Sequence, residues 1–158
     1  MDTLKKVTGT WRGTYSYGPS ERIPKREPVP FTLNLKQGWF GHFTGSVTED
    51  AARGMAGTGI IEGYFSFPSL EFTKKMPVSY VATSDGRSIP VREFLVEQGH
   101  TCEHEVPHRP IFYQGEFSDR RHAQGTWILR AGPLPLGDGR ALMITETKGT
   151  WSIETETA

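Results

Sequence analysis

GTWRGTYSY, residues 9–17, alternates between two kinds of side chain along its whole length. Trp11, Tyr15 and Tyr17 fall on one set of alternate positions, and threonine, arginine and serine occupy the positions between. Successive side chains of a β-strand point to opposite faces, so this pattern predicts a strand with one apolar and one polar face.

The same period of two recurs in segments spread along the chain. A sheet with one polar face indicates antiparallel pairing, because parallel sheets are usually covered on both faces. Short connections such as Gln37-Gly38 and Phe67-Pro68-Ser69 are typical of hairpins. The further alternating segments are residues 31–36, 41–48, 58–65, 70–76, 111–117, 124–129 and 149–154. We therefore expect one all-β domain over residues 1–158, an antiparallel up-and-down barrel of about eight strands.

One long stretch, residues 77–109, interrupts this pattern between the fifth and sixth strands. Within it, the segment from Ser88 to Gly99 has the features of a helix. Ser88 is a suitable N-cap, Pro90 falls in the first turn, and Gly99 is a typical C-terminal stop. We expect this short helix to cap or flank one end of the barrel.

Composition excludes some kinds of partner. The 158 residues carry 18 Lys plus Arg and 18 Asp plus Glu, so neither a nucleic-acid partner nor a membrane partner attracted by a polybasic patch is expected. Cys102 is the single cysteine, which rules out an internal disulfide. The first residues show no apolar stretch of a signal peptide, and no apolar run approaches the length of a membrane span. A cytoplasmic location is the resulting expectation.

The tripeptide Gly-Thr-Trp occurs three times, beginning at Gly9, Gly125 and Gly149. A Gly-x-Trp that opens the first strand of a small meander barrel resembles the calycin group of lipocalins, fatty-acid-binding proteins and avidins, and small bacterial barrels of that type. The resemblance implies a barrel fold and the binding of a small molecule. Gly13 stands where avidins have Asn, so biotin is not the implied ligand.

Four polar side chains share the inward parity of their strands: Tyr15, Tyr17, Lys74 and Tyr113. A lysine among Leu70, Phe72 and Met76 is unusual, because lysine is rarely buried without a partner. One interpretation is a cavity in which these residues bind a partly apolar molecule with an acidic group. The alternative places the Lys74 ammonium in water at the strand end, while the tyrosines merely fill the barrel.

A second group holds most of the histidines and the thiol: His100, Cys102, His104 and His108. Residues 100, 102 and 104 would share a face of an extended chain, as a zinc site needs, but the spacing is irregular and no metal is assigned. Glu49 and Asp50 are placed in a turn, and the sequence identifies no catalytic residue and no cofactor.

The leading hypothesis is a small-molecule-binding barrel without enzymatic activity. A metal-assisted enzyme that uses residues 77–109 is the first alternative, and a protein-interaction module is the second. A homo-oligomer is compatible with all three hypotheses.

Overall fold

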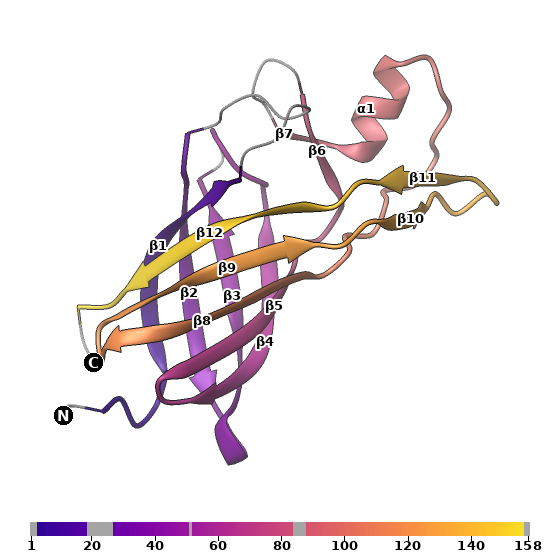
Figure 1. Cartoon of the computed structure of the whole chain (residues 1–158). Helices are drawn as coiled ribbons and strands as arrows, with labels where there is room; N and C mark the ends of the chain where they lie inside the picture. Colours follow the sequence, from indigo (N-terminus) through magenta and orange to yellow (C-terminus); the bar gives the residue numbers. More distant parts are fainter. Residues whose placement is uncertain (1–2, 19–26, 51, 84–87, 157–158) are drawn as a thin grey trace.

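Each alternating segment forms a strand in the computed structural model, which describes residues 3–18, 27–50, 52–83 and 88–156. In these ranges eight antiparallel strands close into a barrel, in the order β1-β12-β9-β8-β5-β4-β3-β2 (Figure 1). The predicted all-β barrel is therefore confirmed. The barrel strands are β1 (Gly9–Tyr17), β2 (Val29–Gln37), β3 (His42–Glu49), β4 (Thr58–Ser66), β5 (Ser69–Lys75), β8 (Ile111–Asp119), β9 (His122–Leu129) and β12 (Thr147–Glu154).

Burial follows the alternation that the sequence shows. Along β4, exposed and buried residues alternate without exception: Ile61 is inaccessible to solvent and its neighbour Ile60 is 65% exposed. The inward positions of all eight strands contribute to one apolar cluster inside the barrel. Large apolar side chains on one face thus determine which face of each strand turns inward.

The barrel closes where β1 pairs with β12, with Gly13 opposite Ile153. A Cβ atom on Gly13 would lie 1.9 Å from the carbonyl oxygen of Ser152. The Ser152 oxygen belongs to the backbone and a Cβ is fixed to its own backbone, so no side-chain rearrangement could relieve this contact. Glycine is therefore required at this position for the two strands to approach.

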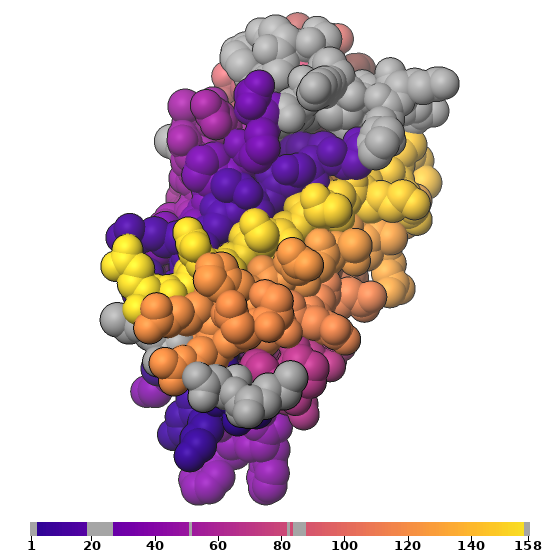
Figure 2. Space-filling view, turned by 60° about the vertical axis from the view of Figure 1, so that its left-hand side comes forward, coloured from indigo at the N-terminus to yellow at the C-terminus, as the bar shows by residue number. Residues whose placement is uncertain are grey.

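One end of the barrel is filled by side chains. Trp11 lies there, its ring edge-on to Phe117 at 5.6 Å, and its Nε1 donates a 2.9 Å hydrogen bond to the carbonyl oxygen of Val7. Leu4 and Val7 are buried in the same cluster. At this closed end, a turn that contains the short 3₁₀ segment η1 (Trp39–Gly41) joins β2 to β3 and projects from the body of the barrel (Figures 1 and 2).

Two excursions from the barrel lie beyond its other end (Figure 1). The first, between β5 and β8, contains β6 (Tyr80–Ala82), β7 (Ser88–Pro90) and α1 (Val91–Glu97). The second, between β9 and β12, is a hairpin of β10 (Gly132–Pro135) and β11 (Ala141–Ile144). They pack together through an apolar cluster separate from the barrel core: Val91, Leu95, Val106 and Leu134.

The helix was predicted in the right place but with the wrong start. Ser88 is not its N-cap, because Ser88–Pro90 pairs with β6 as a strand, and Pro90 caps α1 in an extended conformation. The helix ends at Glu97, and Gly99 follows with φ of 85°. Among the helices of the described residues, none combines the length and the apolar character needed to cross a bilayer.

Candidate functional site

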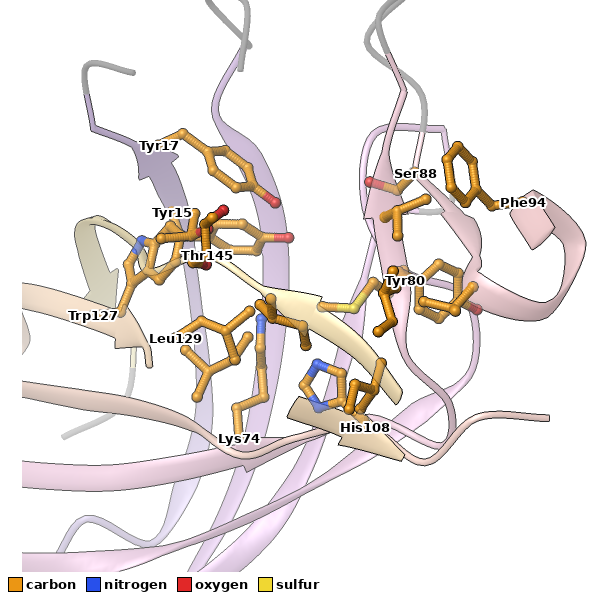
Figure 3. A pocket seen from close by; sticks show the side chains of 18 of the residues that line it. Tyr15, Tyr17, Lys74, Tyr80, Ser88, Phe94, His108, Trp127, Leu129 and Thr145 are labelled. Atoms are coloured by element: carbon orange, nitrogen blue, oxygen red, sulfur yellow. The ribbon is translucent and has the colours of Figure 1, made fainter. Parts of the chain in front are cut away.

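The open end of the barrel holds a cavity of about 360 Å³. Its walls come from three parts of the chain: the inner face of the barrel, the β6–α1 excursion and the β10–β11 hairpin (Figure 3). Most of the lining side chains are aliphatic or aromatic. The lining includes Tyr15, Tyr17, Lys74, Tyr113, Trp127 and Leu129 from the barrel, Tyr80, Phe94 and His108 from the first excursion, and Leu134, Leu142 and Ile144 from the second.

All four residues that the sequence singled out line this cavity: Tyr15, Tyr17, Lys74 and Tyr113. Lys74 does not place its ammonium in water, because its side chain is only 3% exposed. The Lys74 ammonium lies 4.3 Å from the centre of the Tyr15 ring and 5.4 Å from that of Tyr113. These are distances at which an aromatic face attracts a cation.

The Lys74 ammonium pairs with Glu49, a residue that the sequence pattern assigned to a turn. Lys74 Nζ donates a 2.6 Å hydrogen bond to Glu49 Oε2, and the Glu49 side chain is fully buried. Glu49 is the last residue of β3 rather than part of a turn, so the prediction for it was wrong. It shares the inward parity of Phe43 and Val47, and this signal would have identified it.

The second carboxylate oxygen of Glu49 is also used. Glu49 Oε1 accepts a 2.7 Å hydrogen bond from the Tyr15 hydroxyl and a 3.0 Å bond from the Met55 backbone N–H. Both oxygens of the buried carboxylate are thus satisfied, as burial of a charge requires. The result is a fixed unit of Glu49, Lys74 and Tyr15 at the floor of the cavity, which we call the floor triad.

Burial and neighbouring charge act in opposite directions on Lys74. Burial alone lowers the pKa of Lys74, but the adjacent Tyr113 and Glu49 outweigh this effect and hold the pKa above its usual value. Burial, followed by the neighbouring Tyr17 and Glu49, raises the pKa of Tyr15. At neutral pH Lys74 is therefore protonated and the Tyr15 phenol is intact.

His108 projects into the same cavity from the segment before β8 (Figure 3). Its Nδ1 accepts a 3.0 Å hydrogen bond from the Met76 backbone N–H. Burial, together with the charge of Lys74, lowers the pKa of His108 to about 4, so the ring is neutral at pH 7. With its lone pair on Nδ1 engaged, the neutral ring carries its proton on Nε2. Among the described residues the ring is hydrogen-bonded only to Met76, which leaves the Nε2–H available to the cavity.

The other residues of the His/Cys group, to which the sequence analysis assigned no metal, do not lie beside His108. Cys102 Sγ instead donates a hydrogen bond of 3.2 Å to the carbonyl oxygen of His104, and His100 is exposed. Across the described residues, no three His, Cys, Asp or Glu side chains gather closely enough to hold a metal ion. In the tautomer that the Met76 hydrogen bond selects, His108 also presents a proton rather than a lone pair to the cavity.

Aromatic rings form the wall beside the floor triad. Trp127 packs edge-on against Tyr15 at 6.0 Å and against Tyr17 at 5.2 Å. Its Nε1 donates a 3.1 Å hydrogen bond to the carbonyl oxygen of Ser16, which fixes the indole ring. The cavity thus combines rigid apolar walls with few polar groups in fixed positions, the usual character of a small-molecule site.

The closed eight-stranded barrel is compatible with the calycin resemblance noted in the sequence. Comparison with protein-family models, curated proteins and solved structures finds no match to this chain.

Proposed function

We propose that the barrel binds a small, largely apolar molecule in its open-end cavity. The observation that carries this proposal is the cavity itself, about 360 Å³ with mainly aliphatic and aromatic walls. Ligand sites for small molecules occupy roughly 300–1,000 Å³ and have this composition. The two segments that cover the cavity pack against each other in an apolar cluster of their own. The barrel core therefore does not need their side chains to fill the cavity.

Charge balance favours a neutral ligand over the acidic one suggested by the sequence. An anion at Lys74 would have to share the ammonium with Glu49, which already lies 2.6 Å from it. The site would then hold two buried negative charges against one positive charge, at a large energetic cost. The protein thus supplies the acidic group itself, and the ligand has no need to carry one.

His108 adds a polar preference to this apolar site. Its Nε2–H faces the cavity, where it can donate a hydrogen bond to a ligand. A ligand with a carbonyl or ether oxygen at that position would satisfy it. We therefore expect the preferred ligands to be neutral molecules with a flat or branched apolar body and one carbonyl or ether oxygen.

The test uses a neutral fluorescent probe, N-phenyl-1-naphthylamine, and a pair of variants on β9. Leu129→Trp places a bulky ring in the cavity, whereas Thr126→Trp adds the same ring to an exposed position of the same strand. The wild type and Thr126→Trp should bind the probe, and Leu129→Trp should lose at least about tenfold in affinity, which corresponds to 1.4 kcal/mol. Equal binding by a folded Leu129→Trp would show that the probe does not occupy this cavity.

A further inference from the structure

Two large aromatic side chains stand in solvent at the closed end of the barrel, far from the cavity. In the turn between β2 and β3, Trp39 is 85% exposed and Phe40 is fully exposed. Figure 2 shows this turn projecting beyond the neighbouring strands. Single exposed apolar residues are common on protein surfaces, but two adjacent rings at the tip of a projection are not.

The backbone holds the rings in this position. Phe40 has φ of 54° and ψ of 36°, a left-handed conformation that is unfavourable for a bulky residue. Gly41 is also left-handed, and a Cβ there would lie 2.3 Å from the carbonyl oxygen of Phe65. The Gly38 N–H closes the turn with a 2.7 Å hydrogen bond to the carbonyl oxygen of His42. The turn is therefore held in a strained backbone conformation at Phe40, and the rings of Trp39 and Phe40 remain in solvent.

Aromatic and basic side chains lie near the turn, together with Glu62, whose Oε1 is 3.2 Å from His42 Nε2. Tyr64, 57% exposed, lies on β4 beside His42, with ring centres 5.3 Å apart. Lys36 is exposed at the end of β2, and the backbone N–H of Val7 bonds to the side chain of Gln37, so the exposed Lys5 and Lys6 approach the same turn. Tryptophan and tyrosine flanked by lysine are the residues that anchor proteins at the surface of a bilayer.

The size of the tip distinguishes between kinds of partner. A stable protein interface buries about 800 Å² on each partner, far more than two side chains on a convex turn supply. A bilayer needs no complementary shape, since lipid closes around whatever enters it. Other large exposed apolar residues, such as Phe112 on β8 and Met143 on β11, lie on other strands and do not extend the tip.

We propose that the tip formed by Trp39 and Phe40 inserts into the interface of a lipid bilayer, with Tyr64 and the nearby lysines at the level of the headgroups. The expectation of no membrane partner rested on balanced overall charge, and this contact depends instead on aromatic side chains. Glu62 and Glu71 lie on the strands next to the turn, so anionic lipid strengthens binding only modestly. In the docked protein the cavity lies away from the lipid, because the β6–α1 and β10–β11 segments that line it are at the opposite end of the barrel (Figure 1).

The four tryptophans make the test specific. Trp11, Trp127 and Trp151 are each less than 5% exposed, so Trp39 alone among them is in water. With vesicles of phosphatidylcholine and phosphatidylserine, the emission of Trp39 should shift to shorter wavelength, and lipids with brominated acyl chains should quench it. Phe40→Ser keeps the reporter and should weaken co-sedimentation with vesicles at least about fivefold, or about 1 kcal/mol. Ile60→Ser, which removes an exposed apolar side chain elsewhere, should leave binding unchanged.

Three outcomes would overturn the proposal. The first is the absence of both co-sedimentation and a spectral shift with these vesicles. The second is an equal loss of binding in Phe40→Ser and Ile60→Ser. The third is a shift that appears without lipid as protein concentration rises, together with a dimer in analytical ultracentrifugation, which would assign the tip to contact between two copies of the chain.

Discussion

Lys74 and Glu49 form an ion pair of 2.6 Å inside the barrel, and neither side chain is more than 3% exposed. The two residues lie on β5 and β3, with β4 between them, so the pair crosses an intervening strand. The Tyr15 hydroxyl and the Met55 N–H complete the bonding of the carboxylate. The two charges therefore behave as one unit, and removal of either leaves the other buried without compensation.

Lys74→Met should destabilise the protein by roughly 3–5 kcal/mol at neutral pH, because Glu49 then remains as an unpaired buried charge. The double variant Lys74→Met with Glu49→Gln should recover most of this loss. Glutamine keeps an oxygen that can accept from Tyr15 and Met55 without a negative charge. Urea denaturation of the wild type and these two variants measures both effects. A single variant as stable as the wild type would refute the coupling.

Stability should fall in acid because of His108. The pKa of its ring is lowered from 6.5 to about 4 by burial, followed by the charge of Lys74. Between these values the unfolded chain binds a proton that the folded protein does not, so the stabilisation is complete above pH 6.5 and is lost as pH falls toward 4. The total change is about 3 kcal/mol.

The measurement compares wild type with His108→Asn, which keeps an acceptor for the Met76 N–H. The difference in unfolding free energy between the two proteins should shrink between pH 7 and pH 4. This comparison cancels the contribution of His122, whose exposed ring has a raised pKa from its hydrogen bond to Asp119. A constant difference across that range would mean that His108 does not titrate abnormally.

Trp151→Ala and Trp127→Ala should each cost roughly 3–5 kcal/mol, the usual effect of removing a large buried side chain. The loss should be greater for Trp151, which packs against both Phe72 and Tyr113, because Trp127 already borders open space. Only the Trp127 variant should also change probe binding. Losses under 1 kcal/mol for both would contradict the inward orientation of these rings.

Gly13→Ala should prevent normal closure of the barrel, because the added methyl would lie 1.9 Å from the Ser152 carbonyl oxygen. We expect a loss of at least about 3 kcal/mol, since no side chain can move to make room. Arg12→Ala, on the exposed face of the same strand, should change stability by no more than about 0.5 kcal/mol. A folded Gly13→Ala of normal stability, measured by thermal unfolding, would refute the close contact between β1 and β12.

The barrel strands were predictable because each has one face in the core and one in water. That contrast appears in the sequence as a period of two. In β2, for example, the buried Phe31, Leu33 and Leu35 alternate with Thr32, Asn34 and Lys36. The β10–β11 hairpin was not predicted, since its strands are short and Pro133 and Pro135 are atypical of a strand. Likewise Ser88 was assigned to a helix cap because its pairing with Ala82 depends on contacts that local sequence does not record.

The candidate site was predictable in part for the same reason. The alternation along the strand identified Lys74 as inward. It did not show whether the ammonium lies inside the barrel or in water at the strand end. The ion pair with Glu49, across β4, holds it inside. Glu49 was missed because an acidic pair before a glycine is typical of a turn, and that signal was given more weight than strand parity. His108 lies outside any strand, so no periodicity could reveal that the fold draws it into the barrel.

The pairing of β1 with β12 also determines when the nascent chain can complete its fold. Synthesis proceeds from the N-terminus at roughly 5–20 residues per second, so on the order of ten seconds separate the appearance of the two strands. Until residues 147–154 leave the ribosome, the free edge of β1 has no native partner, although β2 can already pair with its other edge. An unpaired strand edge attracts other chains. The nascent chain is therefore most vulnerable to aggregation in the interval that ends when its last strand closes the barrel.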